Sequence, residues 1–375
     1  MGETMVKARG AVIHGVGEKW SVEDLQVGDP GPGEVLVKVM ATGICHSDDH
    51  VVRGDIRAEL PQVGGHEGAG IVEKVGVGVT RVKVGDRVAT LFVPVCGSCR
   101  YCAAGRSYLC ESTAGVRPGY AMDGTLRFQL ADGHGVTATS SLGTFANYLV
   151  CHESQTVAVP DSTDFTAACL VSCGVLTGWG AAVNAGDVRP GDAVLVLGAG
   201  GVGMNVVQGA RHAGADHVIV VDPSEFARSQ APTFGATDTF ASLDDARPRI
   251  EEITGGRGVD VSVITVGRVN GDIIGQAFDL TGKAGTCVVA SLGSTDKHIA
   301  VNPRDFSNRT KTLTGSLFGN CNPVADIPRL LGMHSAGRLK LDELVTRTYR
   351  LEQINEAYDD LHAGVNIRGV ILHEH

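Results

Sequence analysis

From about Thr177 onward, short apolar runs alternate with longer stretches of mixed polarity. The apolar runs are predicted strands at Ala193–Leu197, His217–Val221, Val259–Thr265 and Thr286–Ala290. The stretches between them are long enough for helices, as at Val202–Ala213 and Glu225–Phe234. Because strands and helices that alternate at this interval form right-handed βαβ units, the pattern predicts a parallel sheet.

The first part of the chain has a different pattern. Alternating β-branched runs, separated by Gly and Pro turns, occur at Val35–Val39, Gly70–Val75 and Val82–Val88. They predict short strands in an antiparallel, barrel-like arrangement. After the βαβ region, two predicted helices and a closing strand break the rhythm, at Asp326–Ser335, Leu351–Ala363 and Gly369–His373. We expect this tail to return to the first domain, which then comprises residues 1–176 and 319–375, with residues 177–318 as the second domain.

Length and composition narrow the class of protein. The chain has 375 residues, enough for two domains, and is 43% hydrophobic and 20% charged, as in globular proteins. Its apolar runs fall far short of the ~20 residues of a bilayer span, so no membrane association is expected. The formal charge of -10, without any Lys/Arg block, disfavours nucleic acid as a partner. No apolar segment follows Met1 to Gly10, which predicts no secretory signal and a cytoplasmic location.

Ten cysteines in a chain without an export signal favour metal binding or catalysis over disulfides. Four of them crowd into fifteen residues, and two more stand alone among glycines. We interpret these six as metal ligands: Cys96, Cys99, Cys102, Cys110, Cys45 and Cys173. The other four lie among apolar residues and are interpreted as packing: Cys151, Cys169, Cys287 and Cys321.

A glycine-rich turn joins the first predicted parallel strand to the helix that follows. Its residues are Gly198, Ala199, Gly200, Gly201, Val202 and Gly203. In such a turn the first glycine permits the sharp bend, the second lets backbone amides approach a pyrophosphate, and the third lets helix and strand pack closely. Asp222 follows the next strand, nineteen residues after Gly203, where a carboxylate accepts hydrogen bonds from ribose hydroxyls and repels a 2′-phosphate. The sequence therefore predicts a Rossmann-type dinucleotide-binding domain that prefers NAD(H).

The four-cysteine run has the spacing C-x2-C-x2-C-x7-C from Cys96 to Cys110. Four thiolates on a short loop form a closed tetrahedral cage, which suits a structural Zn²⁺ that braces a lobe lacking a core of its own. An iron–sulfur cluster is an alternative. Ferredoxin-like runs, however, place the fourth cysteine after three residues and before a proline, whereas Glu111 follows Cys110 here.

The remaining group is dispersed along the chain. It consists of Cys45 in Gly43-Ile44-Cys45-His46-Ser47-Asp48, His66 in Gly64-Gly65-His66-Glu67-Gly68, and Cys173 in Ser172-Cys173-Gly174. Taken singly, each of these three residues is more simply explained as core packing. Together with the motifs around them, over the interval from Cys45 to Arg368, they make the whole chain resemble the zinc-dependent medium-chain alcohol dehydrogenases.

This resemblance implies a fold and a set of site residues. The fold is a GroES-like, β-rich catalytic domain with two zinc sites, together with the Rossmann domain. A catalytic zinc is held by Cys45, His66 and Cys173, with Glu67 beside it and able to exchange onto the metal, while the four-cysteine run holds the structural zinc. Ser47 and His50 match the proton relay, with His50 at the outer edge of the site. The dinucleotide contacts implied are His46 and Arg368 on the pyrophosphate and Thr177, Val266 and Leu292 at the nicotinamide.

The activity implied is reversible hydride transfer between a primary alcohol or aldehyde and NAD(H). The long segment between Cys110 and Cys173 resembles the longer-looped, usually dimeric branch of the family, which predicts a homodimer or higher homo-oligomer. Within that branch the chain is most similar to the actinobacterial nicotinoprotein alcohol dehydrogenases, which keep NAD(H) bound and pass electrons to an acceptor such as a nitrosoaniline dye (NDMA). Phe92, Ile56 and Leu109 are predicted to line an apolar substrate channel, with core packing as the alternative for each.

Other functions stay open at this point. Many relatives carry a lysine near the adenosine ribose at the position that Ala227 occupies here, and Arg228 is its neighbour. This departure from the family pattern leaves the strength of NAD binding open. A thiol-adduct-dependent formaldehyde dehydrogenase is one alternative, although the loop after Cys110 lacks the arginine of glutathione-adduct users. A non-catalytic, zinc- and nucleotide-binding sensor is another, which the presence of both Ser47 and His50 disfavours. Zinc-free reductases of the same fold lack the cysteines found here.

Overall fold

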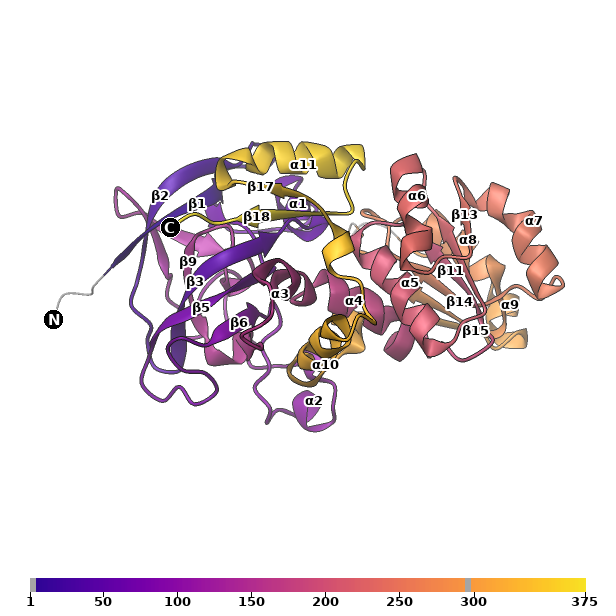
Figure 1. Ribbon diagram of the computed structural model, residues 1–375, viewed down its shortest axis with the longest axis horizontal. Coiled ribbons are helices and arrows are strands. Elements are labelled where there is room, and N and C mark those ends of the chain that lie inside the picture. Colours follow the sequence, from indigo (N-terminus) through magenta and orange to yellow (C-terminus); the bar gives the residue numbers. More distant parts are fainter. Residues whose placement is uncertain (1–4, 294–297) are drawn as a thin grey trace. The chain divides into compact units, whose positions relative to one another are not determined.

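The computed structural model describes residues 5–293 and 298–375, which form two compact units (Figure 1). Unit 1 contains the chain up to Cys173, then Asn322–His362 and Arg368–His375. Unit 2 contains Gly174–Cys321 and the short segment Ala363–Ile367.

A closed five-stranded barrel forms one part of unit 1. Its strands, in order around the barrel, are β1 (Val6–Ile13), β2 (Ser21–Val27), β7 (Phe128–Leu130), β8 (Gly135–Ala138) and β4 (Gln62–Val63). All pairs are antiparallel except β4 with β8. Valine, leucine and phenylalanine side chains fill the interior, with Leu25, Phe128 and Leu142 almost completely buried. The first part of the chain is therefore β-rich and contains a barrel, as predicted, but the predicted strands Val35–Val39 and Gly70–Val75 belong to the second sheet of this unit and not to the barrel.

A seven-stranded sheet forms the other part of unit 1. Its order is β10 (Thr156–Ala158), β6 (Arg87–Thr90), β5 (Gly68–Val75), β3 (Glu34–Gly43), β18 (Arg368–Leu372) and β17 (Val345–Tyr349), with β9 (Tyr148–His152) also paired to β3. The closing strand β18 runs antiparallel to β3 and pairs Val370 with Gly43, so the C-terminal segment returns to the part of the chain that leads into Cys45.

One predicted strand of unit 1 is largely wrong. Within Val82–Val88 only the last two residues belong to a strand, because Lys83 to Asp86 form a turn. The Asp86 carboxylate accepts the Lys83 amide at 3.0 Å, and Gly85 has a φ of +93°, which favours glycine. The alternating valines were compatible with a strand, but Gly85 and Asp86 form a turn, so the strand begins only at Arg87.

The helices of unit 1 are short apart from two near the C-terminus. They are α1 (His46–Val52), α2 (Arg100–Ala103), α3 (Phe165–Val171), α10 (Pro323–Ser335) and α11 (Ile354–Ala363, whose last residue belongs to unit 2). Single 3-10 turns lie at Ser107–Leu109, Thr139–Ser141, Glu153–Gln155, Asp342–Leu344 and Leu351–Gln353. The predicted C-terminal helices and closing strand are confirmed to within a few residues.

Unit 2 is a doubly wound α/β domain. Its six parallel strands have the order β13 (Asp238–Phe240), β12 (His217–Val221), β11 (Ala193–Leu197), β14 (Val259–Ile264), β15 (Thr281–Val289) and β16 (Thr312–Gly315). Numbered within the domain, this order is 3-2-1-4-5-6, that of Rossmann dinucleotide-binding folds. The predicted fold class, a doubly wound parallel sheet together with a β-rich GroES-like domain, is confirmed.

The helices of unit 2 precede or connect its parallel strands. They are α4 (Gly174–Gly180), α5 (Gly201–Ala213), α6 (Glu225–Phe234), α7 (Leu243–Thr254), α8 (Gly271–Leu280) and α9 (Pro303–Asn308), with a π-helical turn at Ala181–Ala185 and a 3-10 turn at Phe318–Asn320. One face of the sheet packs on α7 and α8 through Leu195, Ile250 and Phe278. No single helix in the described ranges is both long and apolar enough to cross a membrane, although the bent pair Phe165–Val171 and Gly174–Ala185 reaches the required length and composition together.

Candidate metal centres and dinucleotide-binding turn

Two groups of metal-ligating side chains converge in the described part of the chain. The first is the four-cysteine run, whose sulfur atoms all lie within 4.8 Å of one another. The sulfurs of Cys96 and Cys102 are 3.9 Å apart, and those of Cys99 and Cys110 are 4.0 Å apart. Four sulfurs at the Zn–S distance of about 2.3 Å form a tetrahedron with edges of about 3.8 Å. The run therefore has the spacing of ligands around a single zinc ion rather than around a multi-iron cluster.

Backbone amides also point at these sulfurs. The amides of Ser98 and Cys99 donate to Cys96 at 3.4 and 3.3 Å, and the amide of Cys102 donates to Cys99 at 3.4 Å. Burial opposes ionisation of Cys96, but the amides outweigh it and lower the pKa of this thiol to about 6. No residue of α2, the one helix of this lobe, is buried. A lobe without a hydrophobic interior needs another source of stability, which a bound zinc supplies.

The second group consists of Cys45, His66, Glu67 and Cys173, whose ligand atoms also lie within 4.8 Å of one another. All four residues are buried in unit 1. Cys45 caps the start of α1, His66 and Glu67 lie in the loop just before β5, and Cys173 follows α3. The structure thus brings together the three predicted ligands of the catalytic zinc, which are separated by up to 128 positions in the sequence.

Asp48 orients the histidine of this group, a role that the sequence analysis missed. Its Oδ2 lies 3.0 Å from Nδ1 of His66, and its Oδ1 accepts the Gly65 amide at 3.0 Å. With Nδ1 turned to the carboxylate, Nε2 is the ring nitrogen that faces the two thiols. Histidines that bind metals commonly donate their other ring nitrogen in this way. The only sequence feature that could have indicated this role is the position of Asp48, three residues after Cys45.

Glu67 forms a buried ion pair with Arg368 in which Oε2 accepts from the guanidinium. Burial raises the pKa of Glu67 to about 8, against the lowering effect of Arg368. Its Oε1 is buried and has no hydrogen-bond partner among the described residues. A Cβ on Gly43 would lie 2.2 Å from Oε2 and 2.8 Å from Arg368, so glycine is required there. Arg368, predicted to contact a pyrophosphate, thus contacts Glu67, and the carboxylate next to the thiols keeps one uncommitted oxygen.

Helix α1 carries the three other predicted residues of this site. Oγ of Ser47 lies 3.5 Å from the Cys45 sulfur, so the hydroxyl is beside the ligand set. His46 is the first residue of the helix and is half-buried, and burial lowers the pKa of its imidazole. His46 therefore offers a neutral N–H donor at neutral pH rather than the positive charge expected for a pyrophosphate contact.

His50, which was predicted at the outer edge of the site, is buried, with only 5% of the residue exposed. The chain turns at Gly54 (φ +76°) and folds back, so that the Ile56 amide donates to the His50 carbonyl at 3.1 Å. This return segment covers the imidazole.

The glycine-rich turn of unit 2 has the geometry that phosphate binding requires. Gly198 has a φ of +95°, and a Cβ on Gly203 would lie 1.9 Å from the Gly198 carbonyl oxygen. A Cβ on Gly200 would meet no described atom within 4 Å, and no described side chain caps the start of α5. The first and third glycines are thus required by packing, whereas the second faces open space at an uncapped helix N-terminus, where an anion is stabilised.

Asp222 ends β12 next to this turn. Its Oδ2 accepts the Ala199 amide at 2.7 Å and its Oδ1 accepts the Ser224 amide at 2.8 Å. Nearby, Arg228 donates to the carbonyls of Asp222 and Pro223 at 2.7 and 2.8 Å. The carboxylate is therefore fixed in place by the backbone at the end of β12.

The residues predicted at the nicotinamide lie in unit 2, and those of the substrate channel lie in unit 1. Val266 and Leu292 follow β14 and β15, at the carboxyl ends of parallel strands, where doubly wound folds bind ligands. Thr177 is half-buried in α4.

The Phe92 ring packs edge-on against His66, with ring centroids 5.7 Å apart, whereas Ile56 and Leu109 are 40% and 38% exposed. Core packing is therefore excluded for the latter two.

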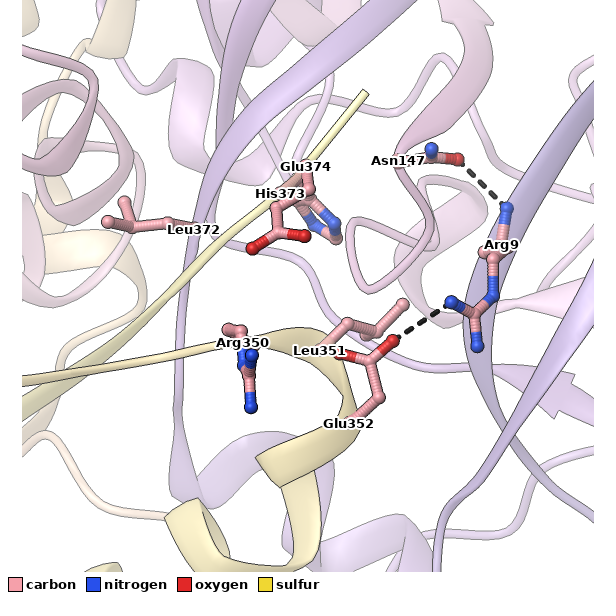
Figure 2. Close-up of a pocket in the computed structure, with 8 residues that line it drawn as sticks. All are labelled: Arg9, Asn147, Arg350, Leu351, Glu352, Leu372, His373 and Glu374. Atoms are coloured by element: carbon pink, nitrogen blue, oxygen red, sulfur yellow. Dashed lines mark hydrogen bonds and ion pairs between the residues drawn. The ribbon is translucent and has the colours of Figure 1, made fainter.

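A small pocket elsewhere in unit 1 is lined by polar and charged residues together with Leu351 and Leu372 (Figure 2). Arg9 donates to Glu352 at 2.9 Å across it, and its backbone amide donates to Asn147 at 2.9 Å. The pocket has a volume of about 60 Å³, room for no more than a few water molecules. None of the predicted site residues lines it, and we assign no ligand to it.

Comparisons with known proteins match the two halves separately and the chain as a whole. The alcohol dehydrogenase GroES-like domain matches residues 31–161, and the zinc-binding dehydrogenase domain matches residues 201–335. The chain is 47% identical to the NDMA-dependent alcohol dehydrogenase of Amycolatopsis methanolica (98% of this chain, 99% of that one) and 46% identical to alcohol dehydrogenase B of Mycobacterium tuberculosis (98% of each).

Solved structures agree with these relatives. The benzyl alcohol dehydrogenase of Acinetobacter calcoaceticus superposes with a TM-score of 0.91 at 30% identity, covering 98% of this chain and 100% of that one. The acetophenone reductase of Geotrichum candidum, solved in complex with NAD, superposes with a TM-score of 0.79 at 27% identity, covering 98% and 97%.

Proposed function

The chain belongs to the zinc-type alcohol dehydrogenase family, and from this premise we propose that Cys45, His66 and Cys173 hold the catalytic zinc of an enzyme that interconverts a primary alcohol and its aldehyde with NAD(H). The observation that carries the proposal is the convergence of these three buried residues, with all ligand atoms within 4.8 Å. Two thiolates and one imidazole are the donors of catalytic zinc sites in alcohol dehydrogenases, which leave one position open. The four-cysteine run holds the structural zinc.

The bound groups supply the electrophilic chemistry, because zinc makes an alcohol hydroxyl acidic near neutral pH and NAD⁺ accepts a hydride. The residues of the chain prepare and complete this reaction. Asp48 holds the His66 ring so that Nε2 faces the metal position, and Cys45 and Cys173 reach it from two different segments. The buried Glu67 carboxylate, paired with Arg368, offers Oε1 as a transient further ligand.

Ser47 and His50 remove the proton of the alcohol. The Ser47 hydroxyl lies next to the Cys45 sulfur, where it would accept the proton of the alcohol. It would pass its own proton toward the His50 imidazole, which lies three residues further along α1. A buried site needs such a relay because water cannot collect the proton directly, and an imidazole changes charge in the physiological range. In unit 2, the Gly200 turn and Asp222 hold the dinucleotide by its pyrophosphate and adenosine ribose.

We further propose that NAD(H) stays bound between turnovers and that the active protein is a homodimer or higher homo-oligomer. The similarity to an NDMA-dependent alcohol dehydrogenase supports the first proposal. An aromatic or other apolar primary alcohol is the proposed substrate class, which the benzyl alcohol dehydrogenase among the structural neighbours and the Phe92 ring against His66 support.

One experiment tests the cofactor set. The purified protein is denatured, the released nucleotide is identified by mass spectrometry, and the metal of the same sample is counted. Two zinc ions and one NAD(H) per chain are expected. A single zinc, iron in place of zinc, or NADP(H) as the released nucleotide would each contradict a named part of the proposal.

Replacing Asp222 with glycine is expected to relax the choice of dinucleotide. The carboxylate that binds the ribose hydroxyls and repels a 2′-phosphate is lost, so the ratio of affinities for NAD⁺ over NADP⁺ should fall about 10- to 100-fold, the equivalent of one or two hydrogen bonds to a charged group. Affinities are measured by titrating nucleotide-free protein. Asp187→Gly, at an exposed loop position with a φ of +49°, is the matched control and should keep the wild-type ratio. A wild-type preference for NADP⁺ would disprove this assignment of Asp222.

Replacing His50 with glutamine is expected to slow alcohol oxidation by roughly 10–100-fold, because the relay loses its proton acceptor. Zinc content and dinucleotide affinity should stay unchanged, and small buffer bases should restore part of the rate. His334→Gln removes another histidine paired with an aspartate in unit 1 and serves as the control. Wild-type turnover by the His50 variant from about pH 6 to pH 9 would show that His50 is no relay, and loss of zinc would show that it is a ligand.

A further inference from the structure

Asp55 and His50 form a hydrogen-bonded pair that is almost completely buried. Oδ2 of Asp55 lies 2.9 Å from Nδ1 of His50, and the two side chains are 9% and 7% exposed. Neither the sequence motifs nor the function proposed above gives Asp55 a role. This carboxylate is shielded from solvent and lies at hydrogen-bond distance from a relay imidazole. It can therefore fix the orientation of the ring and determine which ring nitrogen carries hydrogen.

The local backbone builds this pair. Helix α1 ends at Val52. The backbone amides of Arg53 and Gly54 still donate to the backbone carbonyls of Asp49 and Val51, at 2.9 and 3.0 Å. Gly54 then adopts a φ of +76°, which reverses the chain direction. The amide of Ile56 donates to the carbonyl of His50 itself at 3.1 Å. Residue 55 is therefore returned against the helix face that carries residue 50.

The other two carboxylates of α1 are engaged with different partners. Asp48 pairs with His66, and Asp49 pairs with Arg53 and His362 at 2.5 and 3.0 Å. The pairing of Asp55 with His50 is thus a separate contact and not one member of a shared acidic cluster.

We propose that Asp55 is a positioning residue for the proton relay: it fixes the His50 ring and keeps hydrogen on Nδ1, so that Nε2 accepts the proton that leaves the alcohol through Ser47. A neutral imidazole has one nitrogen that donates and one that accepts, and a carboxylate can only accept. Nδ1 must then be the donor. The proton released by the Ser47 hydroxyl forms an N–H bond at Nε2, both ring nitrogens carry hydrogen, and the Asp55 carboxylate stays ionised as the counter-charge.

This inference rests on the proposed function, and Asp55→Asn tests it separately. An asparagine amide can donate to Nδ1, which favours the tautomer with hydrogen on Nε2 and blocks proton transfer to that nitrogen. We expect kcat for alcohol oxidation to fall by about 10-fold, with KM, zinc content and bound nucleotide unchanged, a loss within the range for a relay residue. Asp55→Glu restores the carboxylate and should recover part of the rate, and it provides the same comparison if the asparagine variant does not fold.

Two controls separate positioning from a structural role. Asp342→Asn removes the same charge from the His334 pair, which is outside the site, and should leave kcat unchanged. The double variant His50→Gln with Asp55→Asn should be no slower than His50→Gln alone, because a residue that acts through His50 has nothing left to position. A further, multiplicative loss in the double variant would overturn the proposal.

Nuclear magnetic resonance of the histidine ring nitrogens gives a readout that does not depend on turnover. The His50 signals are identified among the 13 histidines by their absence in His50→Gln. Wild type should show hydrogen on Nδ1, and Asp55→Asn should show it on Nε2. Hydrogen on Nε2 in the wild type, or wild-type kcat in Asp55→Asn, would refute this inference while leaving the proposed function intact. Absence of alcohol oxidation in the wild type with both zinc sites occupied would instead refute the proposed function.

Discussion

Replacing Cys45 with serine is expected to abolish alcohol oxidation while leaving the protein folded. Cys45 is one of three residues proposed to hold the catalytic zinc, and a serine hydroxyl is a far weaker zinc ligand than a thiolate. Metal content should fall from two zinc ions per chain to one, and turnover should fall by about 10³-fold or more, which corresponds to about 4 kcal/mol of lost transition-state stabilisation. Zinc analysis and initial rates on the same preparation measure both effects.

The fold should survive this change because the group replaced is small and the surrounding segment is held independently. The Cys45 carbonyl accepts the Tyr358 hydroxyl at 3.4 Å, and the Ile44 amide donates to Gly369 at 3.0 Å. Cys169→Ser is the matched control, since this buried thiol belongs to neither cluster and already donates to the Thr166 carbonyl at 3.2 Å, which a hydroxyl can also do. A Cys45 variant that kept two zinc ions and full turnover would remove Cys45 from the site.

The parallel sheet could be predicted closely from the sequence because its signals are local. Four of the six strands contain a compact apolar run, and the predicted strands Ala193–Leu197 and His217–Val221 match the structure residue for residue. The edge strands Asp238–Phe240 and Thr312–Gly315 lack such a run and were not predicted. The turn after the first strand follows from steric rules, since Gly198 and Gly203 are positions where a side chain would collide with backbone. Such features depend on neighbours within about twenty residues along the chain.

The zinc ligands could be proposed only through the resemblance of the whole chain to a family. Cys45, His66 and Cys173 come from three segments, and nothing local in the sequence distinguishes them from buried packing residues. Residues that contact these ligands are even farther apart along the sequence. Glu67 meets Arg368 across 301 positions because β18 pairs with β3, a register that hydrophobic alternation alone does not specify.

The burial of His50 was missed for a different reason. The charged run from Asp48 to His50 reads as a solvated helix face, yet each of its side chains has a partner in the folded chain: His66 for Asp48, Arg53 and His362 for Asp49, and Asp55 for His50. Polar residues are buried here because specific partners offset the loss of hydration. Composition cannot show which partners the fold brings to each of these polar side chains. The burial of α1 is therefore the feature of the site about which the sequence was least informative.

Replacing Cys102 with serine is expected to lower thermal stability and to leave the chemistry largely intact. The four-cysteine lobe has a helix with no buried residue, so a bound zinc accounts for much of its stability. Loss of one ligand should release that zinc and lower the melting temperature by about 10 °C, the shift produced by a loss of about 3–5 kcal/mol in a domain of this size. The variant should also become sensitive to proteolysis between residues 96 and 115.

The contrast between the two cysteine variants locates the two metals. Cys102→Ser should retain one zinc ion and, well below its melting temperature, turnover within about threefold of wild type, because that metal does not contact the substrate. Melting curves, zinc analysis and initial rates are compared for Cys45→Ser, Cys102→Ser and the Cys169→Ser control. A Cys102 variant that melted like wild type but had no turnover would mean that the structural and catalytic assignments must be exchanged, since a ligand of a purely structural ion acts on the reaction only through the fold.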